Sequence, residues 1–422
     1  MAGFLRDLGV KALLTDQNRK STVPLSLLRN EYDFVDNHFY WKHPSFLGRN
    51  WRLPLAIRDG SAIASYGSSL APMFPSRLFG KPFTVSEWDF CYPSEYANEG
   101  AFLVGAYSSL QDWDGLCHFT ICQSVARVEN ENSRLGLFDI LNDPQRSLAM
   151  RSAALFFLRG DVKTAQESYP LLLTPDYLRD GCSINRNPGV IERLGLVGRV
   201  GTMVVPKGKV LQLPAGTRAV FGLEKYWKSA RLSKRFFVAA DTNRTLDELI
   251  RSGVVPAGRI NLKKEIYNSG TGELSLDRKQ NTFKVVTPRS EGFILPQGKR
   301  LSGSYATVEN KFSYGMFLVA ARDDRPLAES RRVLILHLTD SKNFMCRYET
   351  NDFTYLYDWG RLPILLKRGE AVISLKAPSG LKLYACRVNG ERIGEVPFKR
   401  TGDGIRFEAR NTAGAEPVLV YE

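Results

Sequence analysis

The chain has 422 residues, of which 43% are hydrophobic and 24% charged, which is the composition of a globular protein and a length too great for one compact core. Two or three domains are therefore expected. No apolar run is long enough to span a bilayer, so no membrane partner is expected. The formal net charge of +14 would suit a nucleic-acid partner, and the densest basic cluster is 225–235. Because no nucleic-acid-binding motif accompanies that cluster, we expect a basic surface and no nucleic-acid partner.

The first 160 residues alternate strands with helices. The predicted strands are apolar runs at 10–15, 32–41, 82–88 and 115–121, and a short helix precedes the first of them. The predicted helices cover 61–74, 94–113 and 143–161. Ser94 is the expected N-cap of the second, and the third has Asp143 as N-cap, Pro144 at its first position and Gly160 near its end. Repeated strand–helix units indicate a parallel sheet with helices outside it.

Two parallel arrangements fit these units, a doubly wound sheet and a barrel. No Gly-x-Gly-x-x-Gly turn follows a strand, which argues against a dinucleotide cofactor. Polar and aromatic side chains gather where the predicted strands end, and barrel enzymes place their chemistry there. These residues are Asn18, His38, Tyr40, Glu87 and Trp88. The pattern therefore favours a barrel enzyme that needs no cofactor.

After residue 162 the pattern changes to short alternating runs separated by Gly, Asn and Asp, with one helical segment at 245–253. Such runs are typical of a β-sandwich. The predicted fold class is therefore α/β plus all-β. We expect a barrel-like unit at 1–162, a mixed, mainly β connecting domain at 163–262, and a β-sandwich at 263–422. Short, packed joints are expected between them.

The six cysteines and four histidines show no spacing typical of a metal site, so no metal is expected. Cys117 and Cys122 fall in an apolar run and are expected to be small core residues. The cysteine usage suits a reducing compartment, and the start of the chain has no targeting peptide. Both observations slightly favour the cytoplasm.

Glu87 ends the third predicted strand among aromatic residues. A strand-end acid can simply pair with an arginine or cap a helix. Here Trp88 follows it, and His38, Tyr40 and Trp41 end the preceding strand. Aromatic faces stack on the C–H surfaces of sugars, and a carboxylate held by His or Tyr donors can attack an anomeric carbon. These residues favour a carbohydrate site, although both tryptophans could equally be core residues.

Three stretches, HFYWKHP (38–44), PFTVSEWDFCYPSEYANEG (82–100) and AYSSLQDWDG (106–115), together resemble retaining (β/α)8-barrel glycoside hydrolases of the β-galactosidase-like and cellulase-like clan. The resemblance implies the second half of a TIM barrel followed by an appended β-domain. It also implies that Glu87 is the nucleophile at the end of the seventh barrel strand, and that His38 and Tyr40 line the subsite of the reacting sugar. Trp41, Trp88 and Asn18 are further candidate substrate-binding residues.

That clan takes its acid/base Glu from the end of the fourth barrel strand, and only four strand–helix units precede the β-region here. Asn30-Glu31 precedes a strand, so we interpret it as a helix end or loop. The expected function is retaining β-glycoside hydrolysis of an oligo- or polysaccharide, weak or absent in this chain alone. Three explanations for the missing half are expected: the chain is the C-terminal part of a longer gene product, it associates with a separately encoded N-terminal barrel half, or it is a decayed remnant. A signal peptide on the missing half would leave the location open. The alternative is a non-catalytic carbohydrate-binding or scaffold protein.

Overall fold

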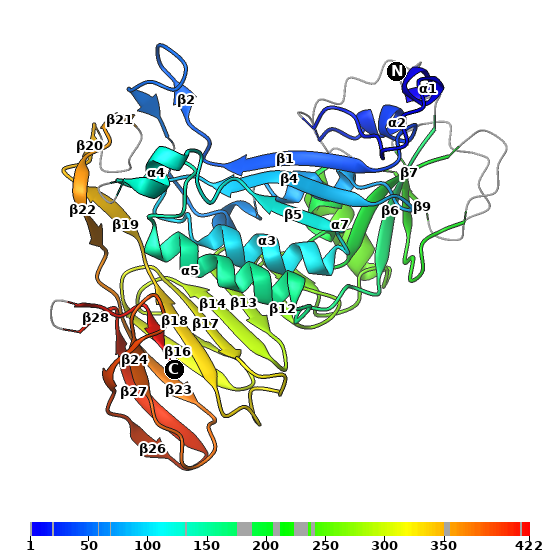
Figure 1. Ribbon diagram of the computed structural model, residues 1–422. Helices are drawn as coiled ribbons and strands as arrows, with labels where there is room; N and C mark the ends of the chain where they lie inside the picture. Colours follow the sequence, from blue (N-terminus) through cyan, green and yellow to red (C-terminus); the bar gives the residue numbers. More distant parts are fainter. Residues whose placement is uncertain are drawn as a thin grey trace.

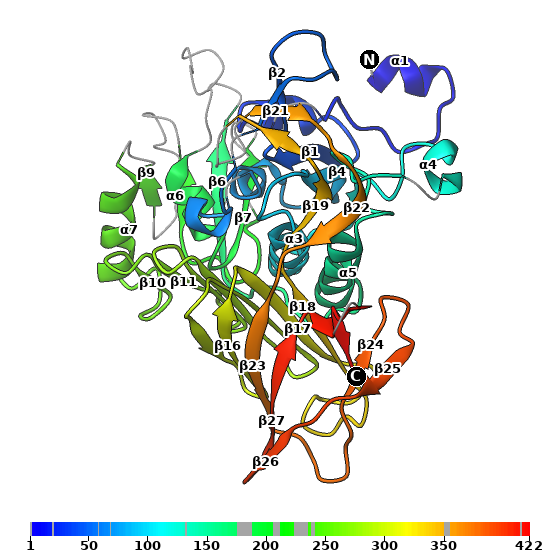
Figure 2. The ribbon, with the colours of Figure 1, turned by 90° about the vertical axis from the view of Figure 1, so that its left-hand side faces the viewer.

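The computed structural model has four layers: a parallel sheet, a pair of helices, a long antiparallel sheet and a shorter antiparallel sheet (Figures 1 and 2). It describes residues 2–18, 21–57, 59–67, 69–130, 133–174, 188–205, 212–222, 235–237, 241–349, 355–413 and 416–422. The fold is therefore mixed α/β with a large antiparallel part.

The first layer is a three-stranded parallel sheet in the order β1-β4-β5. Its strands are β1 (Val35–Trp41), β4 (Phe83–Phe90) and β5 (Gly115–His118). The second layer holds α3 (Glu99–Leu110), which joins β4 to β5, and α5 (Pro144–Ala153), which continues as a π-helical turn over Ala154–Leu158. These elements confirm three predicted strands and two predicted helices. Within the described residues, however, the sheet is open and does not close into a barrel.

The helix caps were predicted with mixed success. Asp143 caps α5, because its carboxylate accepts hydrogen bonds from the backbone N–H groups of Gln145 and Arg146. The predicted cap Ser94 was wrong, since its hydroxyl donates to Asp59 at 2.6 Å and α3 begins only after Asn98.

Two other predicted elements differ from the structure. The stretch 10–15 lies beside β1, where Leu14 accepts a hydrogen bond from the backbone of Asp33, but it forms no strand. The segment 61–74 forms two short 3₁₀ helices, η1 (Ile63–Ser65) and η2 (Ala71–Ser76), in place of one helix. Tyr66 and Gly67 separate them with φ angles of 58° and 77°, which an α-helix cannot accommodate.

The region 163–262 contains a second parallel sheet in the order β7-β6-β8-β9. Its strands are β6 (Ser168–Leu173), β7 (Arg199–Val204), β8 (Val220–Gly222) and β9 (Arg235–Phe237). Two helices accompany it, α6 (Gly189–Leu194) and α7 (Thr242–Arg251), and α7 confirms the helical segment predicted at 245–253.

The third and fourth layers are antiparallel, as the alternating pattern predicted. The ten-stranded sheet runs β10 (Ile260–Asn261), β11 (Ile266–Asn268), β12 (Leu274–Asp277), β13 (Thr282–Val286), β14 (Ser290–Leu295), β17 (Gly315–Ala321), β18 (Val333–Leu338), β30 (Val420–Tyr421), β24 (Tyr384–Cys386) and β25 (Arg392–Glu395). The five-stranded sheet runs β15 (Arg300–Ser302), β16 (Ala306–Phe312), β23 (Glu370–Leu375), β27 (Gly404–Arg410) and β26 (Lys399–Thr401).

Short elements complete the chain. The helices are α1 (Ala2–Asp7), α2 (Leu25–Arg29) and α4 (Val125–Glu129). The strands are β2 (Ser45–Phe46), β3 (Leu55–Ala56), β19 (Ser341–Phe344), β20 (Arg347–Tyr348), β21 (Tyr355–Asp358), β22 (Arg361–Leu366), β28 (Thr412–Ala413) and β29 (Glu416–Pro417). Asn30 follows α2 directly and Glu31 is exposed, so the interpretation of this pair as a helix end is confirmed.

Strand alternation explains how the ten-stranded sheet joins the layers. Along β14 and β17, Phe293 and Phe317 belong to the core shared with the five-stranded sheet, whereas Ile294 and Leu318 belong to the core shared with the helices. Successive side chains of a strand point to opposite faces, so a run of buried residues fills two cores at once. Both faces of this sheet are therefore covered at β14 and β17.

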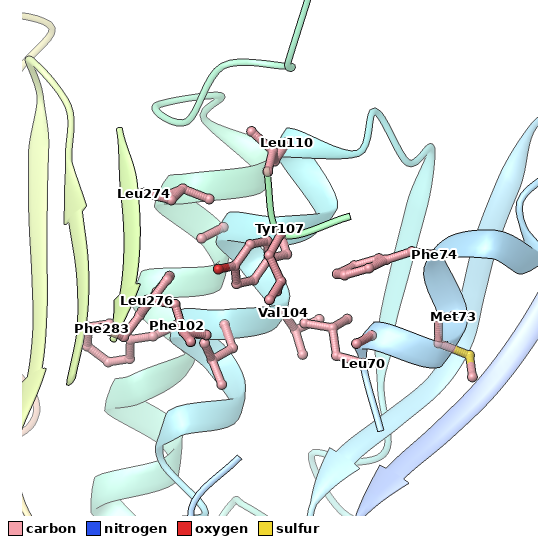
Figure 3. Close-up of a cluster of buried hydrophobic side chains, with 14 of the residues drawn as sticks. Leu70, Met73, Phe74, Phe102, Val104, Tyr107, Leu110, Leu274, Leu276 and Phe283 are labelled. Carbon is pink, nitrogen blue, oxygen red and sulfur yellow. The ribbon is translucent and has the colours of Figure 1, made fainter. Parts of the chain in front are cut away.

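The larger core also connects α3 to its other neighbours (Figure 3). Tyr107 of α3 packs between Phe74 of η2 and Phe283 of β13, with ring centroids 5.9 and 5.6 Å away. This cluster includes side chains from all three of the predicted domains. The parallel sheet is thus fixed on the antiparallel part by continuous apolar packing.

Candidate functional site

Three of the predicted site residues, His38, Tyr40 and Glu87, lie on the face of the parallel sheet that the helices do not cover. In β1, Val35 and Phe39 point into the core, so Asp36, His38 and Tyr40 point the other way. The pairing register shifts between Asn37 and His38, whose partners on β4 are Val85 and Glu87. This β-bulge inserts Ser86 and directs both Ser86 and Glu87 onto the open face, where both contact His38.

Glu87 is bound by two side chains of the neighbouring strand. The Tyr40 hydroxyl donates to Glu87 Oε2 at 2.5 Å, and His38 Nδ1 lies 3.1 Å from the same oxygen. Burial and the adjacent Glu87 carboxylate raise the pKa of Tyr40, so this phenol stays a hydrogen-bond donor. The Glu87 side chain keeps 32% of its surface exposed, which leaves it accessible to a ligand.

A second carboxylate, Asp36, organises the neighbouring polar groups. It accepts hydrogen bonds from the hydroxyls of Thr84 at 2.6 Å and Ser86 at 2.5 Å, and from the side-chain amide of Asn18 at 3.1 Å. The backbone N–H of Ser86 also donates to it at 3.1 Å. Each oxygen of Asp36 therefore accepts two hydrogen bonds. Asn18 therefore contacts Asp36, and its backbone carbonyl accepts from the His38 N–H at 3.2 Å.

The contacts of His38 connect the two acidic residues. The Ser86 hydroxyl donates to Asp36 at 2.5 Å, and the same oxygen lies 2.8 Å from His38 Nε2. His38 Nδ1 lies 3.1 Å from Glu87 Oε2. Ser86 and His38 therefore form a bridge between Asp36 and Glu87.

The two predicted tryptophans do not lie beside Glu87. Trp88 is only 2% exposed and packs in the core against the ring of His118, 4.9 Å away. Trp41 is partly buried and donates its indole N–H to the backbone of Gly60 at 2.9 Å. Trp41 lies two residues after Phe39 on β1 and so points to the same helix-covered face of the sheet. Trp88 follows the bulge on β4 and points to that face as well.

Another aromatic group borders the site in their place. The Tyr40 ring contacts Phe138 and His43, each with a centroid distance of 5.4 Å. Trp51, 60% exposed, continues this group at 6.0 Å from Phe138. The sequence analysis missed Asp36, Thr84 and Ser86 as well as this group. The two polar residues between apolar Val85 and Trp88 were the available signal for the bulge.

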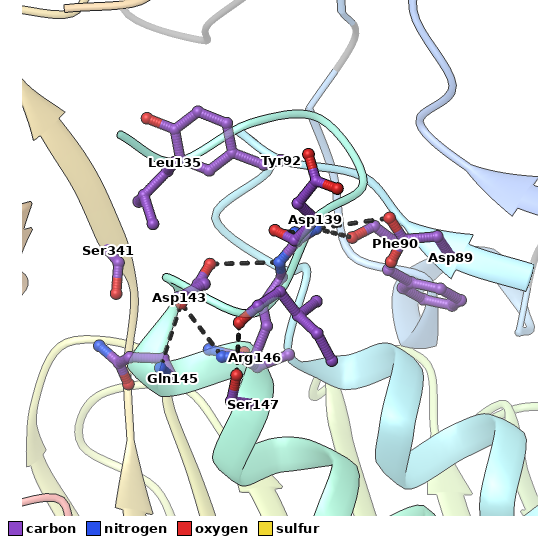
Figure 4. A network of polar contacts seen from close by, with 12 residues as sticks. Asp89, Phe90, Tyr92, Leu135, Asp139, Asp143, Gln145, Arg146, Ser147 and Ser341 are labelled. Atoms are coloured by element: carbon purple, nitrogen blue, oxygen red, sulfur yellow. Dashed lines mark hydrogen bonds and ion pairs between the residues drawn. The ribbon is translucent and has the colours of Figure 1, made fainter. Parts of the chain in front are cut away.

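A buried ionic network fixes the end of β4 (Figure 4). Asp89 pairs with Arg146 of α5 at 3.4 Å. It also pairs with His118 at 3.0 Å. Arg146 also binds Asp143 at 3.1 Å and donates to the backbone of Asp139 at 2.6 Å. Burial lowers the pKa of Arg146, but the carboxylates of Asp89 and Asp143 outweigh this effect and raise that pKa above its usual value. The end of β4, which follows Glu87, is therefore tied to α5.

Other predictions have mixed outcomes. Cys117 is exposed on β5 and Cys122 partly exposed, so their prediction as core residues was wrong. Apart from Arg235, the basic cluster 225–235 lies outside the described residues. Within the described part of the chain, no group of His, Cys, Asp or Glu could hold a metal ion, and no helix is both long and apolar enough to cross a membrane.

Comparisons of the chain with known protein families, with curated proteins and with solved structures found no match.

Proposed function

We propose that Glu87 is the nucleophile of a retaining β-glycoside hydrolase, and that β1, β4 and β5 belong to the second half of its barrel. The observation that carries this proposal is the Glu87 carboxyl group, which Tyr40 and His38 hold on an accessible face of the parallel sheet. In the reaction, a Glu87 oxygen bonds to the anomeric carbon as the bond to the leaving oxygen breaks. Water then hydrolyses the glycosyl ester and releases the sugar.

This reaction also needs a group that protonates the leaving oxygen. The other two carboxylates of β1 and β4 are poor candidates, because Asp36 accepts four hydrogen bonds and Asp89 is paired with Arg146 and His118. General acid catalysis typically contributes on the order of 10²–10⁴-fold. We therefore expect weak or no turnover of ordinary glycosides by this chain alone.

A separately encoded N-terminal barrel half is the partner that would supply the acid. The sheet order supports this part of the proposal, since β1 and β5 each pair only with β4 among the described strands, and an irregular segment ending at Asn18 contacts the outer edge of β1. Unpaired edges of a parallel sheet are unusual in water and favour the addition of further strands.

An activated substrate tests the nucleophile without the missing acid. A 2,4-dinitrophenyl 2-deoxy-2-fluoro-β-glycoside has a leaving group that departs without protonation, and its fluorine slows hydrolysis of the ester. We expect the glucoside or the galactoside to add one fluorosugar, mapped by mass spectrometry to Glu87. Glu87→Gln should abolish labelling, and Glu31→Gln, a change of an exposed acid at the end of α2, should not. Labelling at another residue, or none with either sugar, would contradict the proposal.

The second candidate is a non-catalytic carbohydrate-binding protein. The exposed Trp51 beside the Tyr40–Phe138 group favours it, because indole faces bind sugars without any chemistry. Saccharide binding that depends on Trp51, without labelling of Glu87, would select this candidate.

A further inference from the structure

A cavity of about 290 Å³, which we call the sandwich cavity, lies between the two antiparallel sheets. Ile335 of β18 lines it from the ten-stranded sheet, and Leu375 of β23 and Ile405 of β27 line it from the five-stranded sheet. The segment 377–383, which connects β23 to β24, forms a further wall. All of the lining residues belong to described parts of the chain. Small-molecule sites have volumes of about 300–1,000 Å³, so the cavity is large enough for a small ligand.

The inner wall of the sandwich cavity is aliphatic. Ile335, Leu375, Leu383 and Ile405 line it and also belong to the core that the two sheets share. Each of these side chains is at most 6% exposed. Because an aliphatic wall offers no hydrogen bonds, contact with an apolar group is more favourable than contact with water. The wall therefore favours a ligand with an aliphatic chain.

One polar group of the cavity has no hydrogen-bond partner among the described residues. Tyr305, which directly precedes β16, lines the cavity and is 6% exposed, and its hydroxyl oxygen is buried and unpartnered. Burial and the nearby Glu291 carboxylate raise the pKa of Tyr305 to about 12, so the phenol keeps the proton that it can donate. Buried hydroxyls are normally hydrogen-bonded. The unpartnered hydroxyl therefore indicates a ligand that carries a hydrogen-bond acceptor.

The exposed rim of the cavity is basic. Its charged residues are Arg331, Arg332, Lys382, Arg392 and Glu422. Arg332 and Arg392 bind Glu422 at 2.8 and 2.9 Å, and Lys382 pairs with Glu395 at 3.3 Å. Arg331, in contrast, has no carboxylate within ion-pair distance in the described part of the chain. An anionic group of a ligand could therefore pair with Arg331 without displacing an existing ion pair.

We propose that the sandwich cavity binds an aliphatic carboxylate of short or medium chain length. The chain packs on the aliphatic wall, and the carboxylate accepts a hydrogen bond from the Tyr305 hydroxyl and faces Arg331. One head group can meet both residues because both line the same small cavity. This site goes beyond the proposed hydrolase, since α3, α5 and the ten-stranded sheet lie between it and the parallel sheet that carries Glu87 (Figure 1).

Calorimetry on the full chain with three matched probes tests the inference. The probes are octanoate, 1-octanol, which has the same chain length and no charge, and acetate, which has the carboxylate and almost no chain. We expect octanoate to bind more tightly than either of the other two, because only octanoate contacts both the aliphatic wall and the basic rim.

Two variants assign the binding to this cavity. Tyr305→Phe removes only the hydroxyl and should weaken octanoate binding about tenfold. Arg331→Gln should weaken it about threefold and leave octanol binding unchanged, since an exposed ion pair contributes little. The control Tyr357→Phe removes a hydroxyl from a 44% exposed side chain of β21, and the control Arg251→Gln removes a charge from a 79% exposed side chain of α7. Neither control should change octanoate binding.

The stability of Tyr305→Phe without any probe provides a second measurement. Because the hydroxyl has no partner in the protein itself, this variant should have the urea midpoint of the unchanged protein. A lower midpoint would show that the hydroxyl already has a partner and would contradict the inference. Octanol or acetate binding as tightly as octanoate, octanoate failing to bind, or octanoate binding equally to Tyr305→Phe would also overturn it.

Discussion

The two β-regions of the protein differ in how many of their faces are covered. The ten-stranded antiparallel sheet has helices on one face and the five-stranded sheet on the other, so nearly every residue of β14 and β17 is buried in a core. The three-stranded parallel sheet has helices on one face only, and its other face carries Asp36, His38, Tyr40, Ser86 and Glu87. Positions that packing does not require are the ones available for chemistry.

The largest loss of stability is expected in the ten-stranded sheet, which is covered on both faces at β14 and β17. Phe317 of β17 is fully buried between the two antiparallel sheets. Phe317→Ala should lower the free energy of unfolding by about 3–5 kcal/mol, because it leaves a cavity in that core. The control Phe312→Ala, at a 41% exposed position ending β16, should lower it by less than about 1 kcal/mol. Urea denaturation measures both, and equal losses would break the comparison.

A smaller loss is expected where the two regions meet. Arg146→Ala leaves Asp89 and Asp143 buried without their cation, which should cost about 3 kcal/mol of unfolding free energy. Arg251→Ala removes the surface pair with Asp247 and should cost less than about 0.5 kcal/mol. If Arg146→Ala were equally mild in urea denaturation, this network would not fix the end of β4.

A buried histidine of the ten-stranded sheet should also make the free energy of unfolding depend on pH. Burial lowers the pKa of His337 in β18 from 6.5 to about 3. Between these values the unfolded chain binds a proton that the native chain does not, so stability is lost as the pH falls through this window. His337→Leu should remove about 2 kcal/mol of the stability difference between pH 7 and pH 5, since one pKa unit corresponds to about 1.4 kcal/mol.

The control for that experiment is His43→Gln, at an exposed position outside the sandwich. Urea midpoints at pH 5, 6 and 7 measure the slope for each variant. A slope that persists in His337→Leu would show that the acid sensitivity comes from another group.

The smallest stability effect is expected on the open face, where the functional effect should be specific. Ser86→Ala and Thr84→Val each remove one hydroxyl donor from Asp36 and should each cost about 1 kcal/mol of unfolding free energy. Only Ser86 also contacts His38, so only Ser86→Ala should slow fluoroglycoside labelling of Glu87. Equal labelling rates in both variants would mean that Ser86 does not position His38.

Several features were predictable because they depend on local sequence. The alternation in 32–41 and the run 82–88 fix two strands, and Asp143-Pro144 fixes the start of α5. The placement of Glu87 beside His38 and Tyr40 followed from expecting adjacent parallel strands, and the structure has both contacts. The strand expected at 10–15 failed because it makes only isolated backbone hydrogen bonds with the neighbourhood of β1.

The sequence by itself determined the alternating strands and the Asp143 cap of α5, since these depend on side-chain period and local hydrogen bonding. The prediction that Glu87 ends its strand was wrong, because β4 continues to Phe90. Only the tertiary structure decided which face of the parallel sheet is covered, and with it that Trp88 is buried while Trp51 is exposed. It also decided that Tyr305 and Arg331 line one cavity. Such contacts join residues far apart in the chain, and their energy depends on packing and charge separation, which no local pattern encodes.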